Sequence, residues 1–231
     1  YALANRLDGM IGQVLDRLAE NGLADDTLVV YASDHGEQIG ERGLWWKHTF
    51  YEDSAKVPLI LAWPGHLAGG GRREQVVNLI DLTATMLDAV GAPSLPNSQG
   101  RSFWPLVLDP SAPWLDETFC EYCTDPKPAW TGGMAVQQRM IRQGRWKCIY
   151  YHGYRPQLFD LALDPDELDD LAEDPAHAAV RDRLVERILA DWDPERIAQR
   201  MRQRLADKAL LAAWGKAVRP PDSIRWPLAP E

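Results

Sequence analysis

Two adjacent side chains in this chain, Asp34 and His35, are of types that ligate metal ions. They follow an apolar run over residues 28–32, and Gly36 comes directly after them. Such a run bounded by turn residues predicts a buried parallel strand, and ligand crevices of open α/β sheets lie beyond the carboxyl ends of these strands. A carboxylate oxygen with an imidazole nitrogen suits a divalent cation. On spacing alone, an Asp and a His at a strand end more commonly form a turn and a capping contact than a metal site.

Lys47 lies thirteen positions beyond Asp34, across a glycine-punctuated loop. The loop could fold back and bring its ammonium group over a metal site, although a solvated surface lysine is the simpler interpretation. Trp45 and Trp46 precede it. We expect these rings to pack beneath the loop, with cation–π contact to a quaternary ammonium group as the alternative.

The composition limits which partners are plausible. The 231 residues carry a formal net charge of −9, which argues against broad electrostatic binding of nucleic acid. An anionic small-molecule substrate would therefore need a local positive group, from a metal ion or from specific Lys and Arg side chains. Apolar runs of eighteen residues are absent from the sequence, so we expect no membrane-spanning helix.

The elements that would position these residues alternate between helix and strand. Apolar residues recur at helical spacing over 3–18, and Asn21-Gly22 predicts a stop. Strands are expected at 27–32 and 57–63, and a helix from Asp81, as N-cap, to Val90. This order predicts an α/β fold, with part of a mixed, largely parallel sheet covered by helices.

The second part of the sequence has a different pattern. After a proline-rich stretch, short strands are expected at 118–123, 134–142, 145–151 and 158–161, with a hairpin turn at Gln143-Gly144. Asp174-Pro175 and Asp193-Pro194 each predict a helix start, and a proline-rich tail follows. We predict three parts: residues 1–110 of a large α/β domain, a small α+β antiparallel subdomain over 111–192, and a helical tail over 193–231.

The segment SDHGEQIGERGLWWKHTFYEDSAKVPLILAWPG resembles the sulfatase family of the alkaline-phosphatase superfamily. Further matching segments follow the family's order: NGLADDTLVV before it, then NLIDLTATMLDAVG, RMIRQGRWKCIYY and QLFDLALDPDELDDLAEDP. Together they cover most of residues 1–192. The segment GLWWKHTFYEDSAKVPL is most similar to choline-sulfatase-type members of the family.

The resemblance implies an alkaline-phosphatase-like fold and hydrolysis of a small sulfate monoester, with choline sulfate as a candidate. It implies that Asp34 and His35 are ligands of the active-site divalent cation, often calcium or manganese. It also implies that Lys47 is both catalytic and substrate-binding, because the matching residue contacts the sulfate and can neutralise the leaving oxygen.

The departures from the family pattern concern the nucleophile. Sulfatases make a formylglycine from the Cys of a Cys-x-Pro/Ala-x-Arg motif, and none of Cys120, Cys123 and Cys148 lies in that context. The chain is therefore expected to be the C-terminal portion of a longer enzyme and to be inactive alone. Two rival functions are a phosphonate monoester or phosphodiester hydrolase of the same superfamily, and a non-catalytic binding or assembly module. The tail from Asp193 could join subunits into a homo-oligomer, or could be a frayed terminus.

Overall fold

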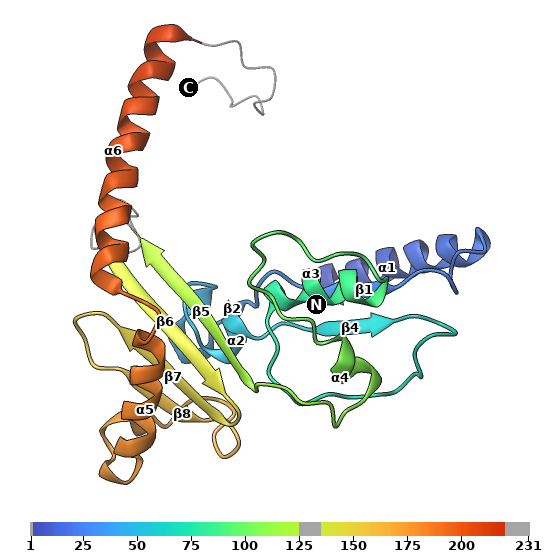
Figure 1. The fold of residues 1–231 in the computed structure, drawn as a ribbon, viewed down its shortest axis with the longest axis horizontal. Coiled ribbons are helices and arrows are strands. Elements are labelled where there is room, and N and C mark those ends of the chain that lie inside the picture. Colours follow the sequence, from blue (N-terminus) through green and yellow to red (C-terminus); the bar gives the residue numbers. More distant parts are fainter. Residues whose placement is uncertain (1, 125–134, 220–231) are drawn as a thin grey trace. The chain divides into compact units, whose positions relative to one another are not determined.

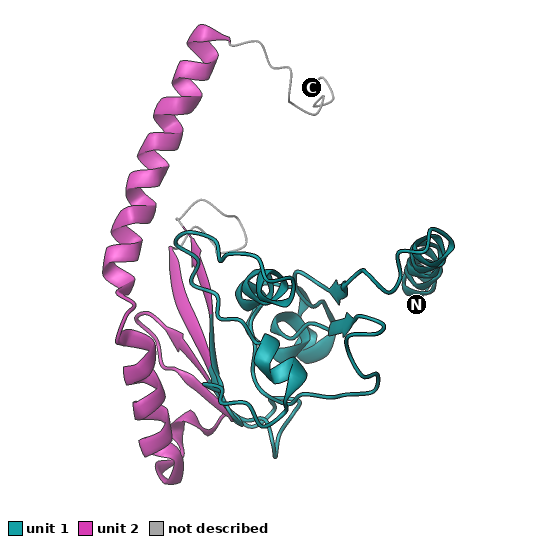
Figure 2. Ribbon diagram, turned by 45° about the vertical axis from the view of Figure 1, so that its right-hand side comes forward, with its two compact units in different colours: residues 1–119, 142–147, 160–169 teal, residues 120–141, 148–159, 170–231 magenta. Residues whose placement is uncertain are grey.

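The computed structural model of the chain describes residues 2–124 and 135–219. The chain divides into two compact units, coloured separately in Figure 2. Unit 1 comprises residues 1–119, 142–147 and 160–169, and unit 2 comprises residues 120–141, 148–159 and 170–231. The division we predicted at 110 and 192 remains a prediction. Met134 and the proline-rich tail beyond Arg219 lie outside the described residues.

Unit 1 begins with helix α1, Ala2–Glu20, as the apolar periodicity predicts. Gly22 adopts a positive φ of 67° just after it, and the Leu23 amide donates to the Leu18 carbonyl at 3.1 Å. A left-handed glycine with this hydrogen bond is a common helix stop, so the predicted end is confirmed. The apolar stripe of α1 is not covered: none of its residues is buried.

Strands β1, Val29–Ala32, and β4, Leu59–Ala62, lie side by side in unit 1 (Figure 1). Their pairing is antiparallel, with Val29 opposite Ala62, so the predicted parallel pairing is wrong. Parallel pairing requires a crossover that returns the chain to the start of the first strand. Here the chain folds β2 (Gln38–Ile39), β3 (Trp45–Trp46) and α2 (Glu52–Ala55) at the far end of β1 and comes back from that end.

Helix α3, Leu79–Ala89, begins three residues earlier than we predicted. Its N-cap is Asn78, whose side chain accepts from the Ile80 amide at 3.2 Å. Asp81, predicted as the N-cap, is instead the third helical residue and accepts from the Asn78 amide at 3.0 Å. The two side chains form a capping box, in which both residues have cap-forming chemistry. Helix α4, Trp104–Leu108, completes the helices of this unit.

A four-stranded sheet follows, in the order β5 (Glu117–Thr124), β6 (Val136–Gln143), β7 (Trp146–Tyr151) and β8 (Gln157–Asp160). Its strands match those predicted, and Gly144 has the positive φ, 53°, that the hairpin turn requires. The predicted antiparallel subdomain is confirmed. In unit 2, the fully buried side chains are mostly apolar and come from the strands and α5: Ile141, Cys148, Ile149, Leu158, Phe159, Leu184 and Ile188.

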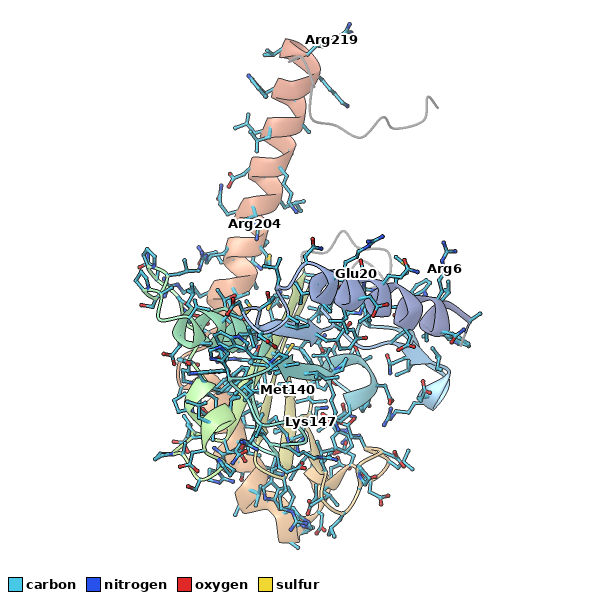
Figure 3. All side chains as sticks on the ribbon, turned by 90° about the vertical axis from the view of Figure 1, so that its right-hand side faces the viewer. Arg6, Glu20, Met140, Lys147, Arg204 and Arg219 are labelled. Carbon is cyan, nitrogen blue, oxygen red and sulfur yellow. The ribbon has the colours of Figure 1, made fainter. Side chains whose placement is uncertain are left out.

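Two helices end the described part of unit 2. Asp174 caps a short 3₁₀ turn, and α5 then runs over Ala178–Leu189. Asp193 caps α6, Pro194–Val218, by accepting from the Arg196 amide at 3.0 Å, as predicted from the Asp-Pro pair. In Figure 3, the label Arg204 lies on α6, and the label Arg219 marks the residue directly after it. None of the described helices combines the length and the apolar character needed to cross a lipid bilayer.

Candidate functional site

A small hairpin between β2 and β3 returns the chain to the end of β1. Gln38 pairs with Trp46 across the hairpin, which places Lys47 opposite residue 37. Gly40 and Gly43 adopt positive φ values of 124° and 71° in the connection, a backbone that glycine accepts without strain. The hairpin therefore brings Lys47 back to the Asp34-His35 pair, as the glycine-punctuated loop allows.

The three residues singled out in the sequence converge at this place. Lys47 Nζ lies 2.6 Å from His35 Nε2, and Asp34 Oδ2 lies 3.4 Å from the same nitrogen. The His35 amide also donates to Asp34 Oδ1 at 3.0 Å. One ring nitrogen thus faces both a carboxylate and an ammonium group. The roles that we assign to these residues remain predictions.

The other ring nitrogen of His35 shows which tautomer is present. Nδ1 lies 2.8 Å from the Gly36 carbonyl oxygen, which can only accept a hydrogen bond, so Nδ1 carries the proton. The lone pair of the neutral ring is then on Nε2, on the side of Asp34. Metal-binding histidines commonly donate their second ring nitrogen to a carbonyl in this way.

Asp34 and His35 therefore fit a divalent cation as an oxygen and nitrogen pair. Their side chains are 84% and 33% exposed, so an incoming ion can reach both. Within residues 2–124 and 135–219, no cluster of three or more His, Cys, Asp and Glu side chains could hold an ion. Two ligands by themselves do not complete a metal site.

Close backbone contact with α2 holds the Asp34-His35 turn in place. The Gly36 amide donates to the Ser54 carbonyl at 2.8 Å. A Cβ atom at position 36 would lie 2.1 Å from the Asp53 carbonyl oxygen, so only glycine permits this approach. On the other side of the turn, the Ser33 hydroxyl donates to the His35 carbonyl at 2.8 Å.

The two tryptophans of β3 do not pack beneath the loop as we expected. Trp45 and Trp46 are 64% and 65% exposed. Each strand of the hairpin has only two residues, and the buried side chain of the hairpin is Gln38, whose amide oxygen accepts from the Thr49 hydroxyl at 3.2 Å. The packing prediction is therefore wrong for the described chain, and the cation–π alternative is untested.

An apolar cavity of about 550 Å³ lies elsewhere in unit 1. Leu7, Ile11 and Leu15 of α1 line one side, and Tyr31 and Ile60 of the β1–β4 pair line the other. None of the three candidate site residues lines it. The candidate site is thus a polar surface at the strand end and not this cavity.

Sequence reasoning assigned no role to three charged residues that support the site loop, Glu52, Lys147 and Glu167. Lys147 and Glu167 have side chains with 0% exposure, and Glu52 has 22%. Burial opposes ionisation of Glu52, but the charge and hydrogen bond of Lys147, with Arg142, keep its pKa below the usual range. A lysine within the apolar strand segment WKCIYY was the available signal, because an unpaired lysine is almost never fully buried.

Comparison with known proteins identifies the family. Residues 40–193 match the family model described as the C-terminal region of N-sulphoglucosamine sulphohydrolase. The chain belongs to the sulfatase family. The matched region includes Lys47 and begins after Asp34 and His35.

Individual sulfatases match over most of the chain. It is 37% identical to the choline-sulfatase of Rhizobium meliloti (strain 1021) over 215 residues, which cover 89% of this chain and 39% of that protein. It is 37% identical to arylsulfatase K of Rattus norvegicus over 181 residues, covering 74% of this chain and 31% of the relative. The chain thus spans less than two fifths of the length of these relatives.

Among solved structures, the phosphonate monoester hydrolase of Silicibacter pomeroyi is similar, with a TM-score of 0.71 and 34% identity. The match covers 81% of this chain and 39% of that one. The architecture of this sulfatase chain is alkaline-phosphatase-like, as in its sulfatase neighbours and in this phosphonate monoester hydrolase.

Proposed function

We propose that this sulfatase chain is the C-terminal portion of a metal-dependent enzyme that hydrolyses a sulfate monoester. The supporting observation is the convergence of Asp34, His35 Nε2 and Lys47 Nζ on one exposed point at the end of β1. Negative charge develops on the transferring group when a sulfate ester is cleaved. A cation and an ammonium group fixed at that point would stabilise it.

The cation would be held by the Asp34 carboxylate and by Nε2 of His35, and calcium or manganese are the expected ions. When bound, it supplies Lewis-acid stabilisation of the negative charge. The contact between His35 Nδ1 and the Gly36 carbonyl leaves the single lone pair of the ring on Nε2. A cation bound there would replace the contact with Lys47, whose three N–H donors would then be available to sulfate oxygens and the leaving oxygen.

The attacking group would come from a part of the enzyme outside this chain, as a formylglycine. The three cysteines here occur as CEYC, CTDP and CIYY, none of which matches the motif that is converted. The remaining metal ligands would come from the same outside part. We accordingly propose that residues 1–231 alone do not turn over substrate.

The choline-sulfatase relative makes choline sulfate a candidate substrate. A second candidate function is hydrolysis of phosphonate monoesters or phosphodiesters, favoured by the 34% identical hydrolase structure. Both chemistries would use the same cation and Lys47. The choice between them therefore depends on measured rates.

The test uses the full-length protein, purified and assayed on choline sulfate, an aryl sulfate and an aryl phosphonate monoester. We expect the sulfates to be hydrolysed faster, activity to be lost with a chelator, and calcium or manganese to restore it. Asp34→Ala should lose bound metal and activity while retaining its fold, because the Asp34 side chain is 84% exposed. A faster phosphonate reaction would establish the second function. Metal binding without turnover of any ester would indicate a binding module.

We also propose that α6 joins subunits into a homo-oligomer. Its four large exposed apolar side chains occur at spacings that place them on one side of the helix: Leu210, Leu211, Trp214 and Val218. Trp226, in the tail beyond, lies outside the described residues. Removal of residues 193–231 should reduce the mass measured by light scattering, and an unchanged mass would show that the tail has no such role.

A further inference from the structure

Three charged side chains of unit 1 form a buried ion cluster. Lys147 on β7, labelled in Figure 3, lies 2.9 Å from Glu52 Oε1 and 2.8 Å from Glu167 Oε1. Arg142 approaches the other oxygen of Glu52 at 3.5 Å. With Arg142, two carboxylates face two cations, and removing Lys147 would leave the carboxylates of Glu52 and Glu167 without their shared buried partner.

The cluster is bonded directly to the first turn of α2. The second oxygen of Glu167 accepts from the backbone amide of Glu52 at 2.6 Å. Glu52 is the first residue of α2, so its amide is one of the helix N-terminal donors that have no partner inside the helix. Glu167 thus holds α2 through its backbone, and Lys147 holds the same turn through the Glu52 side chain.

A second set of contacts ties the loop to the same segment around Glu167. Arg42 pairs with Asp53 at 2.8 Å, and its guanidinium group lies 4.2 Å from the centre of the Tyr51 ring. The same side chain donates to the Asp166 carbonyl oxygen. The loop between His35 and Lys47 and the helix α2 that follows it are therefore both attached to the turn that carries Glu167.

The backbone conformation of Glu167 indicates that the surrounding contacts hold this residue firmly in place. Its φ is +54°, a backbone conformation that costs energy for a residue other than glycine. The turn is closed by the Glu167 amide, which donates to the Asp164 carbonyl at 3.2 Å. The strained backbone directs a fully buried carboxylate towards α2 and Lys147.

From these contacts we infer that Glu167 and Lys147 are positioning residues for the Asp34-His35 pair. Glu167 and Lys147 hold the first turn of α2, and the Ser54 carbonyl of α2 accepts from the Gly36 amide next to His35. The Gly36 carbonyl in turn orients the His35 ring. The predicted effect on cation affinity rests on the proposed function. The predicted effect on the Gly36 amide rests only on contacts within the described structure.

The test compares Glu167→Gln with the wild type in the full-length protein. The substitution keeps the shape of the side chain and removes one of the two negative charges that Lys147 faces. The matched control is Arg139→Met, which removes a buried cation paired with Glu121 at 3.2 Å and with Asp191 in unit 2. Both variants should be less stable to urea.

Two readouts separate positioning from general loss of stability. Hydrogen exchange of the Gly36 amide in metal-free protein should become faster in Glu167→Gln and stay as in the wild type in Arg139→Met. The Kd of calcium or manganese should rise by roughly 10–100-fold in Glu167→Gln only, the range seen when outer partners of metal ligands are changed. If Glu167→Gln does not fold, Glu52→Gln, whose side chain is 22% exposed, replaces it with the same expectations.

The outcomes of the inference and of the proposed function can be distinguished. A wild type that binds no cation overturns the proposed function, while the Gly36 exchange rates still decide the positioning by Glu167. Equal Gly36 protection in Glu167→Gln and in the wild type overturns the inference, whatever the cation affinity. Equal losses in Glu167→Gln and Arg139→Met would also overturn it, because general destabilisation would then explain both.

Discussion

Lys47 Nζ and His35 Nε2 lie 2.6 Å apart, although twelve positions separate them in the chain. The contact joins the residue proposed to bind the anion to a residue proposed to bind the cation. A sulfate group bound beside this pair would lie near the ammonium group of Lys47 and near a cation held by His35, so both positive charges would act on its oxygens.

Lys47→Ala is expected to lower kcat of the full-length enzyme by roughly 10²–10³-fold, the usual cost of removing one donor to developing negative charge. The cation affinity should change much less than the rate, because Asp34 and His35 remain. Steady-state kinetics and metal titration measure the two effects. Lys56→Ala, which removes another exposed lysine nearby, is the control and should leave kcat unchanged. A Lys47→Ala enzyme with wild-type kcat would contradict the assignment.

Gly36→Ala should weaken cation binding without direct loss of a ligand. The added methyl group would lie 2.1 Å from the Asp53 carbonyl oxygen, so the turn at Asp34-His35 must move away from α2. Calorimetric titration of the metal measures the effect. Gly69→Ala is the control, because nothing lies within 4 Å of the corresponding Cβ position. Similar Kd values for the two variants would show that the close contact is unimportant.

The lowered pKa of Glu52 predicts that the folded protein loses stability in acid. Burial raises its pKa, but Lys147 and Arg142 outweigh burial, so its pKa in the folded protein is below 4.5. The carboxylate therefore stabilises the fold fully above pH 4.5, and this contribution is lost as the pH falls through the lower folded-state pKa. In urea unfolding, the difference in unfolding free energy between the wild type and Glu52→Gln should be constant at neutral pH and shrink in acid. A pH-independent difference would contradict the prediction.

Cys148 should resist alkylation in the folded protein. Burial raises the pKa of its thiol to about 12, with a further increase from the charge of Asp170, so the reactive thiolate is scarce at about pH 8. Cys120 is exposed on β5 and should react with iodoacetamide under the same conditions. Peptide mass spectrometry with and without denaturant measures both sites. Modification of Cys148 at the rate of Cys120 before unfolding would refute the burial argument.

Local patterns were sufficient for several elements of the fold. The apolar periodicity of α1 with Gly22, and the Gln143-Gly144 turn between β6 and β7, were predicted because neighbouring residues determine them. The direction of β4 relative to β1 was not, because it depends on the path of the chain between them. The predicted start of α3 was too late because Asn78 and Asp81 both have cap-forming side chains. Only the folded capping box shows which of them is the N-cap.

The candidate site was predictable only in part. Asp34 and His35 are marked by the end of an apolar strand, and Lys47 by the family resemblance. Their convergence depends on the β2–β3 hairpin, whose two-residue strands are too short for a period-two pattern to reveal. The pairing of Glu52 with Lys147 and Glu167 spans 95 and 115 positions, so no local pattern could have indicated it.

This long separation also has a consequence for folding. The amide of Glu52 reaches its carboxylate partner only when residue 167 is available, and such distant contacts are slow to form because a large loop must close first. During synthesis, the strand end that carries Asp34 and His35 leaves the ribosome long before Glu167. The contacts that hold α2 beside the candidate cation site are therefore completed late, and in chains stopped before residue 167 the first turn of α2 would lack the bond from the Glu52 amide to Glu167.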